Sequence, residues 1–204
     1  SGRLTPKRRD EAVDLMNQIA DAVFSQDLAD NFEHHGWLQQ WQQQIPVYID
    51  WQIKRNGKWQ VKETESRHEL ALTEQLKVTG QLDRIDSDEN QLGILDYKTG
   101  QIPKQNEVLE GEAVQLPIYA LLATSGQLPV REVAYLDLSS KAKIEEPYTL
   151  AADELNVLSH GIASRLSQVV QQIEQGTGLP AWGDTKTCQY CDMKLLCRRQ
   201  AWDD

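Results

Sequence analysis

Two short stretches, GQLDRID at residues 80–86 and ILDYKTG at residues 94–100, decide how the middle of this chain folds. Both have the apolar character of β-strands, and the polar run between them predicts the turn of a hairpin. With the turn at Glu89-Asn90, Asp83 on the first strand lies directly opposite Asp96 on the second. We therefore expect the Cβ atoms of these two aspartates to be about 4.5–5.5 Å apart.

Two carboxylates at this distance indicate a site for a divalent cation. Their charges repel each other, a cation between them would remove the repulsion, and their oxygen ligands suit Mg²⁺ or Mn²⁺. Residues two apart in a strand share a face, so Lys98 lies beside Asp96. Its ammonium group could orient an attacking water or stabilise charge on a phosphoryl oxygen. The alternative is a set of solvated hairpin charges, which explains any single residue better than it explains all three.

A helix expected at residues 111–123 carries a polar pair. Gln115 and Tyr119 are one helical turn apart and share one face of a helix that is otherwise apolar. Both side chains could therefore contact the same substrate.

The remaining pattern predicts an α/β protein. Helices are expected from Thr5 to about residue 23, over residues 28–44 and over residues 152–175. Pro46 should end the second helix, because alternating apolar residues from Val47 to Ile53 indicate a strand. Further strands are expected near residues 59–61, 70–85, 92–98, 132–138 and 143–148. This order indicates a mixed β-sheet flanked by helices, and the absence of a Gly-rich strand-to-helix turn argues against a Rossmann fold.

Composition limits the class of protein. Hydrophobic residues make up 40% of the 204-residue chain, but no apolar run approaches the roughly 18 residues of a membrane span. The formal net charge of −10 argues against nonspecific coating of nucleic acid, which depends on excess Lys and Arg. We expect three segments: a helical segment at 1–45, an α/β core at 46–180 and a cysteine-containing segment at 181–204.

All three cysteines, Cys188, Cys191 and Cys197, fall in one short window. An odd, clustered set without a secretory signal indicates metal ligation in a reducing compartment, hence a cytoplasmic protein, rather than disulfides. Thiolates suit Zn²⁺ or an iron–sulfur cluster, each of which usually takes four protein ligands. Ordinary buried thiols are the alternative.

The chain resembles the PD-(D/E)XK nucleases of the RecB and AddB type through three sequence motifs together: G-x-L-D-R-I-D, I-L-D-Y-K-T-G and Q-L-P-x-Y-A. The resemblance implies a restriction-endonuclease-like α/β core that hydrolyses DNA with Mg²⁺ or Mn²⁺. It implies that Asp83, Asp96 and the Tyr97 carbonyl hold the metal and that Lys98 is the catalytic lysine. Gln115 and Tyr119 would hold DNA. Glu65 resembles the upstream acidic residue of the family, and Glu63 competes for that role.

Two features of the family are missing from this sequence. The metal-ligating histidine that follows a Gly-rich word has no counterpart, because His34, His35 and His68 lack that context. In AddB-like nucleases an upstream cysteine joins three C-terminal ones to hold a 4Fe-4S cluster, and Cys188, Cys191 and Cys197 resemble those three. Both absences are upstream, so we expect an N-terminally truncated fragment.

The resemblance implies an exonuclease acting on single-stranded DNA or free DNA ends, in repair or recombination, beside a helicase subunit or domain. The alternative is a catalytically inactive DNA-binding or scaffold module of a helicase–nuclease complex. Intact Asp83, Asp96 and Lys98 favour the enzyme. A zinc-binding interaction domain is a third interpretation, and it depends on the cysteines alone.

Overall fold

The structure is a computed structural model that describes residues 4–25, 32–124, 126, 128–139, 143–178, 183 and 188–197. The chain divides into two compact units, Ser1–Ser164 and Arg165–Asp204. The strands of the described residues all belong to the first unit. No helix in the described part is both long and apolar enough to cross a membrane.

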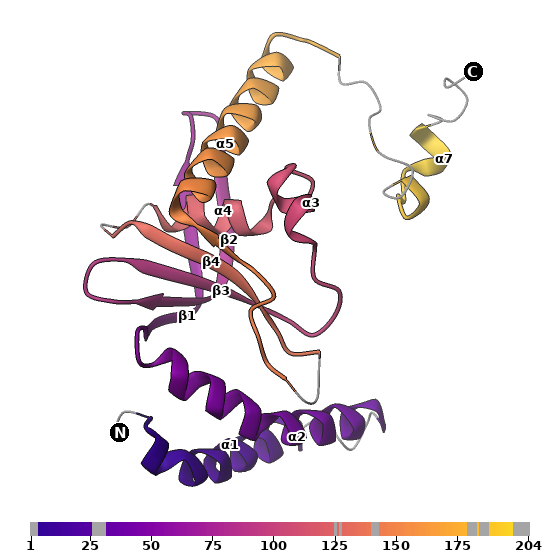
Figure 1. Cartoon of the computed structure of the whole chain (residues 1–204). Coiled ribbons are helices and arrows are strands. Elements are labelled where there is room, and N and C mark those ends of the chain that lie inside the picture. Colours follow the sequence, from indigo (N-terminus) through magenta and orange to yellow (C-terminus); the bar gives the residue numbers. More distant parts are fainter. Residues whose placement is uncertain are drawn as a thin grey trace. The chain divides into compact units, whose positions relative to one another are not determined.

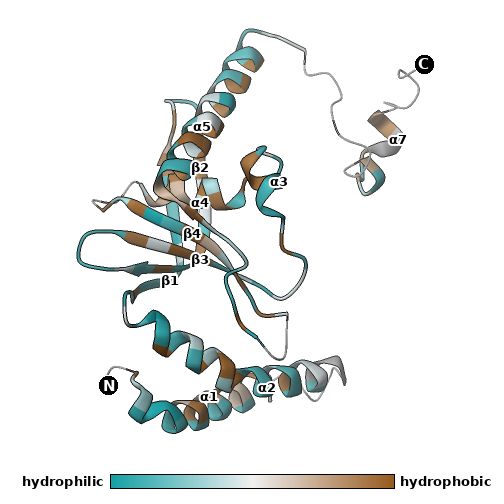
Figure 2. Cartoon of the chain, viewed as in Figure 1, coloured by the Kyte–Doolittle hydropathy of each residue, from teal (hydrophilic) through white to brown (hydrophobic). Residues whose placement is uncertain are grey.

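The N-terminal part is helical. A short 3-10 turn, η1 (Pro6–Arg8), leads into α1 (Arg9–Phe24), which lies along α2 (Phe32–Arg55) (Figure 1). Both helices carry hydrophilic and hydrophobic residues along their length (Figure 2). Their apolar sides meet in a small core around Ala20, Ile45 and Ile49.

The prediction of a strand from Val47 to Ile53 is wrong, because α2 continues through Pro46 to Arg55. The alternating apolar residues of this short segment fit a strand and one face of a helix equally well. Buried residues recur at helical spacing instead, at Ile45, Ile49 and Gln52. Burial of this face outweighs the single hydrogen bond that a helical proline loses.

Five strands form one sheet in the order β1-β2-β3-β4-β5. Their bounds are β1 (Gln60–Ala71), β2 (Lys77–Ser87), β3 (Leu92–Lys98), β4 (Val130–Asp137) and β5 (Thr149–Ala151). The β3–β4 pair is parallel and the other three neighbouring pairs are antiparallel, so the sheet is mixed. This confirms the predicted fold class.

Helices connect and flank these strands. The parallel β3–β4 crossover contains α3 (Gln105–Leu109) and α4 (Gln115–Ala123), as a parallel connection requires. The long predicted helix is confirmed as α5 (Ala152–Glu174), and α7 (Lys194–Cys197) is a single turn near the C-terminus.

Two strand predictions need correction. The strand expected over 70–85 is divided, because the chain turns at residues 72–76, where the Thr73 hydroxyl accepts bonds from the backbone N–H groups of Gln75 and Leu76. The strand expected over 143–148 is absent, and this segment makes only an isolated bridge from Glu145 to Asp137.

The hairpin register agrees with the sequence. Arg84 pairs with Leu95 and Ile85 with Ile94, which is the register that puts Asp83 opposite Asp96. The turn is held by Asp88, whose carboxylate accepts hydrogen bonds from the backbone N–H groups of Asn90 and Gln91.

Helix α4 packs closely on the sheet. Leu116 and Leu122 are fully buried, and each such side chain contributes about 1.5–3 kcal/mol of hydrophobic stabilisation. A Cβ atom at Gly80 would lie 2.7 Å from Leu122 Cδ1, so glycine permits this close approach of α4 to β2. The packing places the start of α4, and hence Gln115, over the end of β3.

Candidate active site

The two aspartates predicted to hold a metal lie together. The backbone N–H of Tyr97 donates to Asp83 Oδ2 at 2.9 Å, which ties the Asp83 side chain to the backbone beside Asp96. Asp96 is 2% exposed. Burial raises the pKa of its carboxyl group above the ordinary value, Lys98 acts in the opposite direction, and the charge of Asp83 raises this pKa further. The two carboxylates therefore repel each other, as the hairpin register predicts.

Lys98 completes the arrangement on β3. Its Nζ lies 2.7 Å from Asp96 Oδ2 and donates to Gln115 Oε1 at 2.9 Å. The Lys98 side chain is 25% exposed, against 3% for that of Asp96. The ammonium group is therefore the more accessible member of the pair.

The side-chain amide of Gln115 contacts three other residues of the site. Its amide nitrogen donates to Asp96 Oδ1 at 2.9 Å and to the Tyr119 hydroxyl at 3.1 Å, while its amide oxygen accepts from Lys98. Partial burial raises the pKa of Tyr119, so the phenol stays protonated at neutral pH. The predicted polar pair on α4 thus reaches the predicted residues of β3.

The donor set fits a divalent cation of the Mg²⁺ type. Two carboxylates are adjacent, and the buried Asp96 Oδ2 accepts no well-directed hydrogen bond although it is ion-paired with Lys98. Within the described residues, no three His, Cys, Asp or Glu side chains are grouped so that they could hold a metal. The protein would supply Asp83, Asp96 and the Tyr97 carbonyl, and Mg²⁺ usually keeps several waters as its other ligands.

Glu65 lies on the strand next to Asp83, at the position opposite that aspartate. It lies on β1 between the pairs Thr64–Arg84 and Ser66–Leu82, and its exposed side chain accepts from Gln81 Nε2 at 2.6 Å. Its φ of 49° is in the left-handed region, which is uncommon for a residue other than glycine.

The other upstream candidates have partners of their own. Glu63 Oε2 is 3.3 Å from His68 Nε2 on the same strand. His35 is exposed on α2, and the side chain of His34 lies outside the described part. His68 Nε2 also lies 3.0 Å from the Ser66 hydroxyl, so the partners of this histidine are on β1.

A buried ionic cluster supports the site from the α2 side and was missed in the sequence. Arg84 donates to Asp86 Oδ1 at 2.7 Å, and Arg55 donates to Asp86 Oδ2 at 2.5 Å. Arg84 also donates to Gln52 at 2.6 Å and to the Tyr97 hydroxyl at 3.3 Å. The i, i+2 spacing of Arg84 and Asp86 was the available signal, because such residues share a face of a strand.

The three cysteines belong to the second unit. Cys188 is half-buried, whereas Cys191 and Cys197 are exposed. They are not gathered into a group of three metal ligands in the described residues. Their role as cluster ligands therefore stays a prediction.

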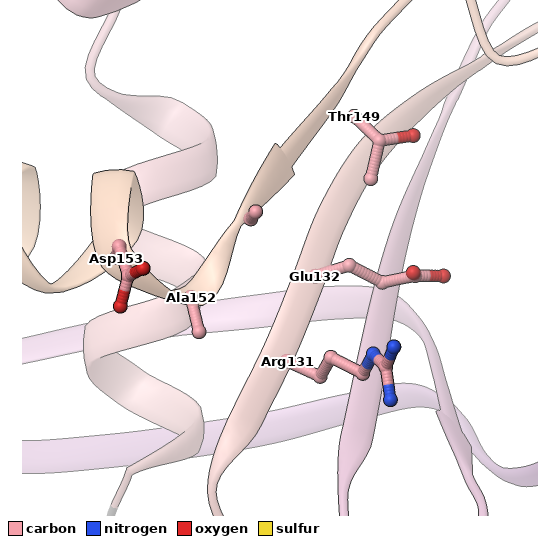
Figure 3. Close-up of a pocket in the computed structure, with 6 residues that line it drawn as sticks. Arg131, Glu132, Thr149, Ala152 and Asp153 are labelled. Atoms are coloured by element: carbon pink, nitrogen blue, oxygen red, sulfur yellow. The ribbon is translucent and has the colours of Figure 1, made fainter.

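A pocket of about 330 Å³ lies away from these residues (Figure 3). It lies where β4, β5 and the start of α5 meet, and its polar lining residues are Arg131, Glu132, Thr149 and Asp153. None of the predicted site residues lines it, so it is separate from the Asp83–Asp96–Lys98 arrangement.

A mixed sheet that carries D-x-K on one strand, opposite a second aspartate, is the arrangement expected of a restriction-endonuclease-like nuclease. The family model of the PD-(D/E)XK nuclease superfamily matches residues 2–198, and the chain belongs to this superfamily. Members of this superfamily are typically nucleases that act on DNA with a divalent metal ion, so membership indicates a nuclease.

Other comparisons are more distant. No curated protein matches the chain significantly. Among solved structures, the crystal structure of SSO0001 is similar with a TM-score of 0.39 and 14% identity, over 91% of this chain and 81% of that one. A likeness this weak adds nothing to the assignment, which rests on the family model.

Proposed function

We propose that the protein is a Mg²⁺- or Mn²⁺-dependent DNA exonuclease of the RecB and AddB type. The observation that carries this proposal is the joining of Asp96, Lys98 and Tyr119 through the single amide of Gln115, with Asp83 beside them. Side chains from two strands and a helix converge there, and they are the residue types that phosphodiester hydrolysis requires.

Each residue has a role in the proposed reaction. Asp83, Asp96 and the Tyr97 carbonyl would hold the cation, which stabilises negative charge at the phosphate when it is bound. Lys98 would orient the attacking water and neutralise charge on a phosphoryl oxygen as the P–O bond to the leaving nucleotide breaks. Gln115 and Tyr119 would hold the DNA backbone beside Lys98. Glu65, which lies opposite Asp83 on β1, is proposed as the upstream acidic residue of the site.

Cleavage of end-labelled single-stranded DNA in Mn²⁺ or Mg²⁺ tests this function. We expect cleavage by the unchanged chain, and its loss in Asp96→Asn and Lys98→Ala. Matched controls are Asp14→Asn and Lys77→Ala, which change an exposed aspartate and an exposed lysine elsewhere in the fold. Circular dichroism would check that every variant is folded.

The outcomes separate the competing functions. Cleavage that persists in both site variants would overturn the proposed residue roles. Metal-independent DNA binding without cleavage, in every variant, would favour the non-cleaving DNA-binding or scaffold module. A labelled circular strand as second substrate tests the preference for free ends, because an exonuclease should leave it intact.

The finer proposals extend to the second unit and to partners. We propose that Cys188, Cys191 and Cys197 bind a 4Fe-4S cluster with a fourth ligand, in a cytoplasmic protein that works beside a helicase subunit or domain. The support is their spacing, C-x2-C-x5-C. Iron and zinc analysis of anaerobically purified protein, beside Cys191→Ser, distinguishes a cluster from a zinc site.

A further inference from the structure

Tyr135 on β4 is a buried aromatic residue next to the candidate active site that the proposed reaction does not use. It is 0% exposed, and it pairs with Asp96 in the parallel register between β3 and β4. Lys98 Nζ lies 5.2 Å from the centroid of the Tyr135 ring. A cation within about 6 Å of an aromatic centroid is attracted by the negative face of the ring.

The Tyr135 hydroxyl does not explain why a tyrosine is here. This oxygen is buried and has no hydrogen-bond partner among the described residues. An unpaired buried hydroxyl lowers stability rather than raising it. Burial also raises the pKa of Tyr135, so the ring remains an uncharged phenol at neutral pH. The part of this side chain that acts on the site is therefore the face of its ring.

Contacts around Tyr135 hold that ring in a fixed orientation. Tyr148 meets it edge to face, with ring centroids 6.1 Å apart and planes at 87°. The Tyr148 hydroxyl in turn donates to the carbonyl of Pro103 at 2.7 Å, in the loop that follows Lys98. The ring is thus tied to the segment that carries the lysine.

In addition to the Tyr135 ring, two groups face the Lys98 ammonium group, one on β3 and one on α4. Asp96 provides a carboxylate and Gln115 an amide oxygen, and both attract Nζ. Once Asp96 binds a cation, less of its charge would be available to Lys98. The ring face has no oxygen ligand to offer that cation. Its attraction for the Lys98 ammonium group would therefore remain.

We propose that Tyr135 is a positioning residue for Lys98, whose ammonium group its ring face holds beside Asp96 and Gln115. This inference rests on the proposed function in that Lys98 is taken as the catalytic lysine. The placement of Lys98 over the ring is a separate physical claim that can be measured without any catalysis.

Two variants separate the ring from the hydroxyl. Tyr135→Phe keeps the ring and removes the unpaired oxygen, whereas Tyr135→Leu removes the ring. Leu136→Ala is the matched control, because it opens a cavity at the next residue of β4, which is also fully buried but pairs with Tyr97 and points to the opposite face of the sheet.

The first measurement is the ¹H–¹³C spectrum of the lysine CεH₂ groups in the full chain, with Lys98 assigned from Lys98→Arg. Protons above a ring face are shielded, so we expect an upfield Lys98 signal in the unchanged chain, Tyr135→Phe and Leu136→Ala. The shift should be lost in Tyr135→Leu. A Lys98 signal that is the same with and without the ring would overturn the proposal.

The second measurement is kcat for single-stranded DNA in Mn²⁺. We expect Tyr135→Leu to lower kcat about tenfold with a smaller change in KM, while Tyr135→Phe stays within about twofold of the unchanged chain. Equal losses in Tyr135→Phe and Tyr135→Leu, or an equal loss in Leu136→Ala, would overturn a role for the ring. If the unchanged chain does not cleave DNA, the proposed function fails, and the spectrum alone still decides whether Tyr135 holds Lys98.

Discussion

Replacing Asp86 by asparagine tests how much the cluster behind the candidate active site contributes to folding. Asp86 is 0% exposed and carries the only carboxylate in contact with Arg84 among the described residues. The other partners of Arg84 are the amide of Gln52, the hydroxyls of Tyr48 and Tyr97 and the ring of Trp51, none of which is a carboxylate. Asparagine keeps the shape of the side chain and removes its charge, so a buried guanidinium would lose its counter-charge.

The magnitude follows from burial. The Arg84 side chain is 3% exposed, and removing one partner of a buried ion pair typically costs about 3–5 kcal/mol. The change affects the ion pairing of Arg55 less, because its carboxylate partners Glu146 at 3.0 Å and Glu132 at 3.7 Å remain. We therefore expect Asp86→Asn to lower the free energy of unfolding by about 3 kcal/mol or more.

The control is a pair of the same chemistry in a different environment. Arg9 and Asp50 are 2.6 Å apart, yet their side chains are 37% and 46% exposed. Water screens such a pair, so Asp50→Asn should cost about 0–1 kcal/mol. Urea unfolding followed by circular dichroism measures both variants, and urea avoids the ionic screening of guanidinium. Equal m-values would show that the same unfolding transition is being compared.

A loss in Asp86→Asn no larger than that in Asp50→Asn would refute this reasoning. A double-mutant cycle with Arg84→Met adds a second check, because the two residues are in contact. Removing both should cost less than the sum of the single variants, since the uncompensated charge disappears with Arg84.

Three further predictions concern the candidate active site. Gln115→Leu removes the amide that joins Asp96, Lys98 and Tyr119, so kcat on single-stranded DNA should fall about tenfold or more, while Tyr119→Phe, which keeps that amide, should lose less. Mn²⁺ at one hundred times its Kd should stabilise the unchanged chain by about 2.7 kcal/mol in thermal melting, and EDTA or Asp96→Asn should abolish this gain. Glu65→Gly relieves the left-handed φ of 49° and should raise stability by no more than about 1 kcal/mol in urea unfolding. Unchanged cleavage in that variant would remove Glu65 from the proposed catalytic residues.

Local chemistry was enough to predict the hairpin and which of its polar residues lie side by side. The polar turn sets the register between β2 and β3, and the two-residue period of a strand puts Lys98 beside Asp96. The helical period likewise put Gln115 and Tyr119 on one face of α4. These relations span at most a few residues or one tight turn, so they can be read directly from the sequence.

Other features depended on which element covers which face. The apolar residues around Ile49 fit a strand and a helix equally well, and burial against α1 decided for the helix. Arg55 meets Asp86, which is distant in the sequence, and no local pattern specifies that pairing. Tyr135 is likewise distant from Lys98, and only the parallel pairing of β3 with β4 brings its ring beneath the ammonium group. A sequence determines which side of an element is polar or apolar through its short periods, whereas long-range packing alone decides what lies against that side.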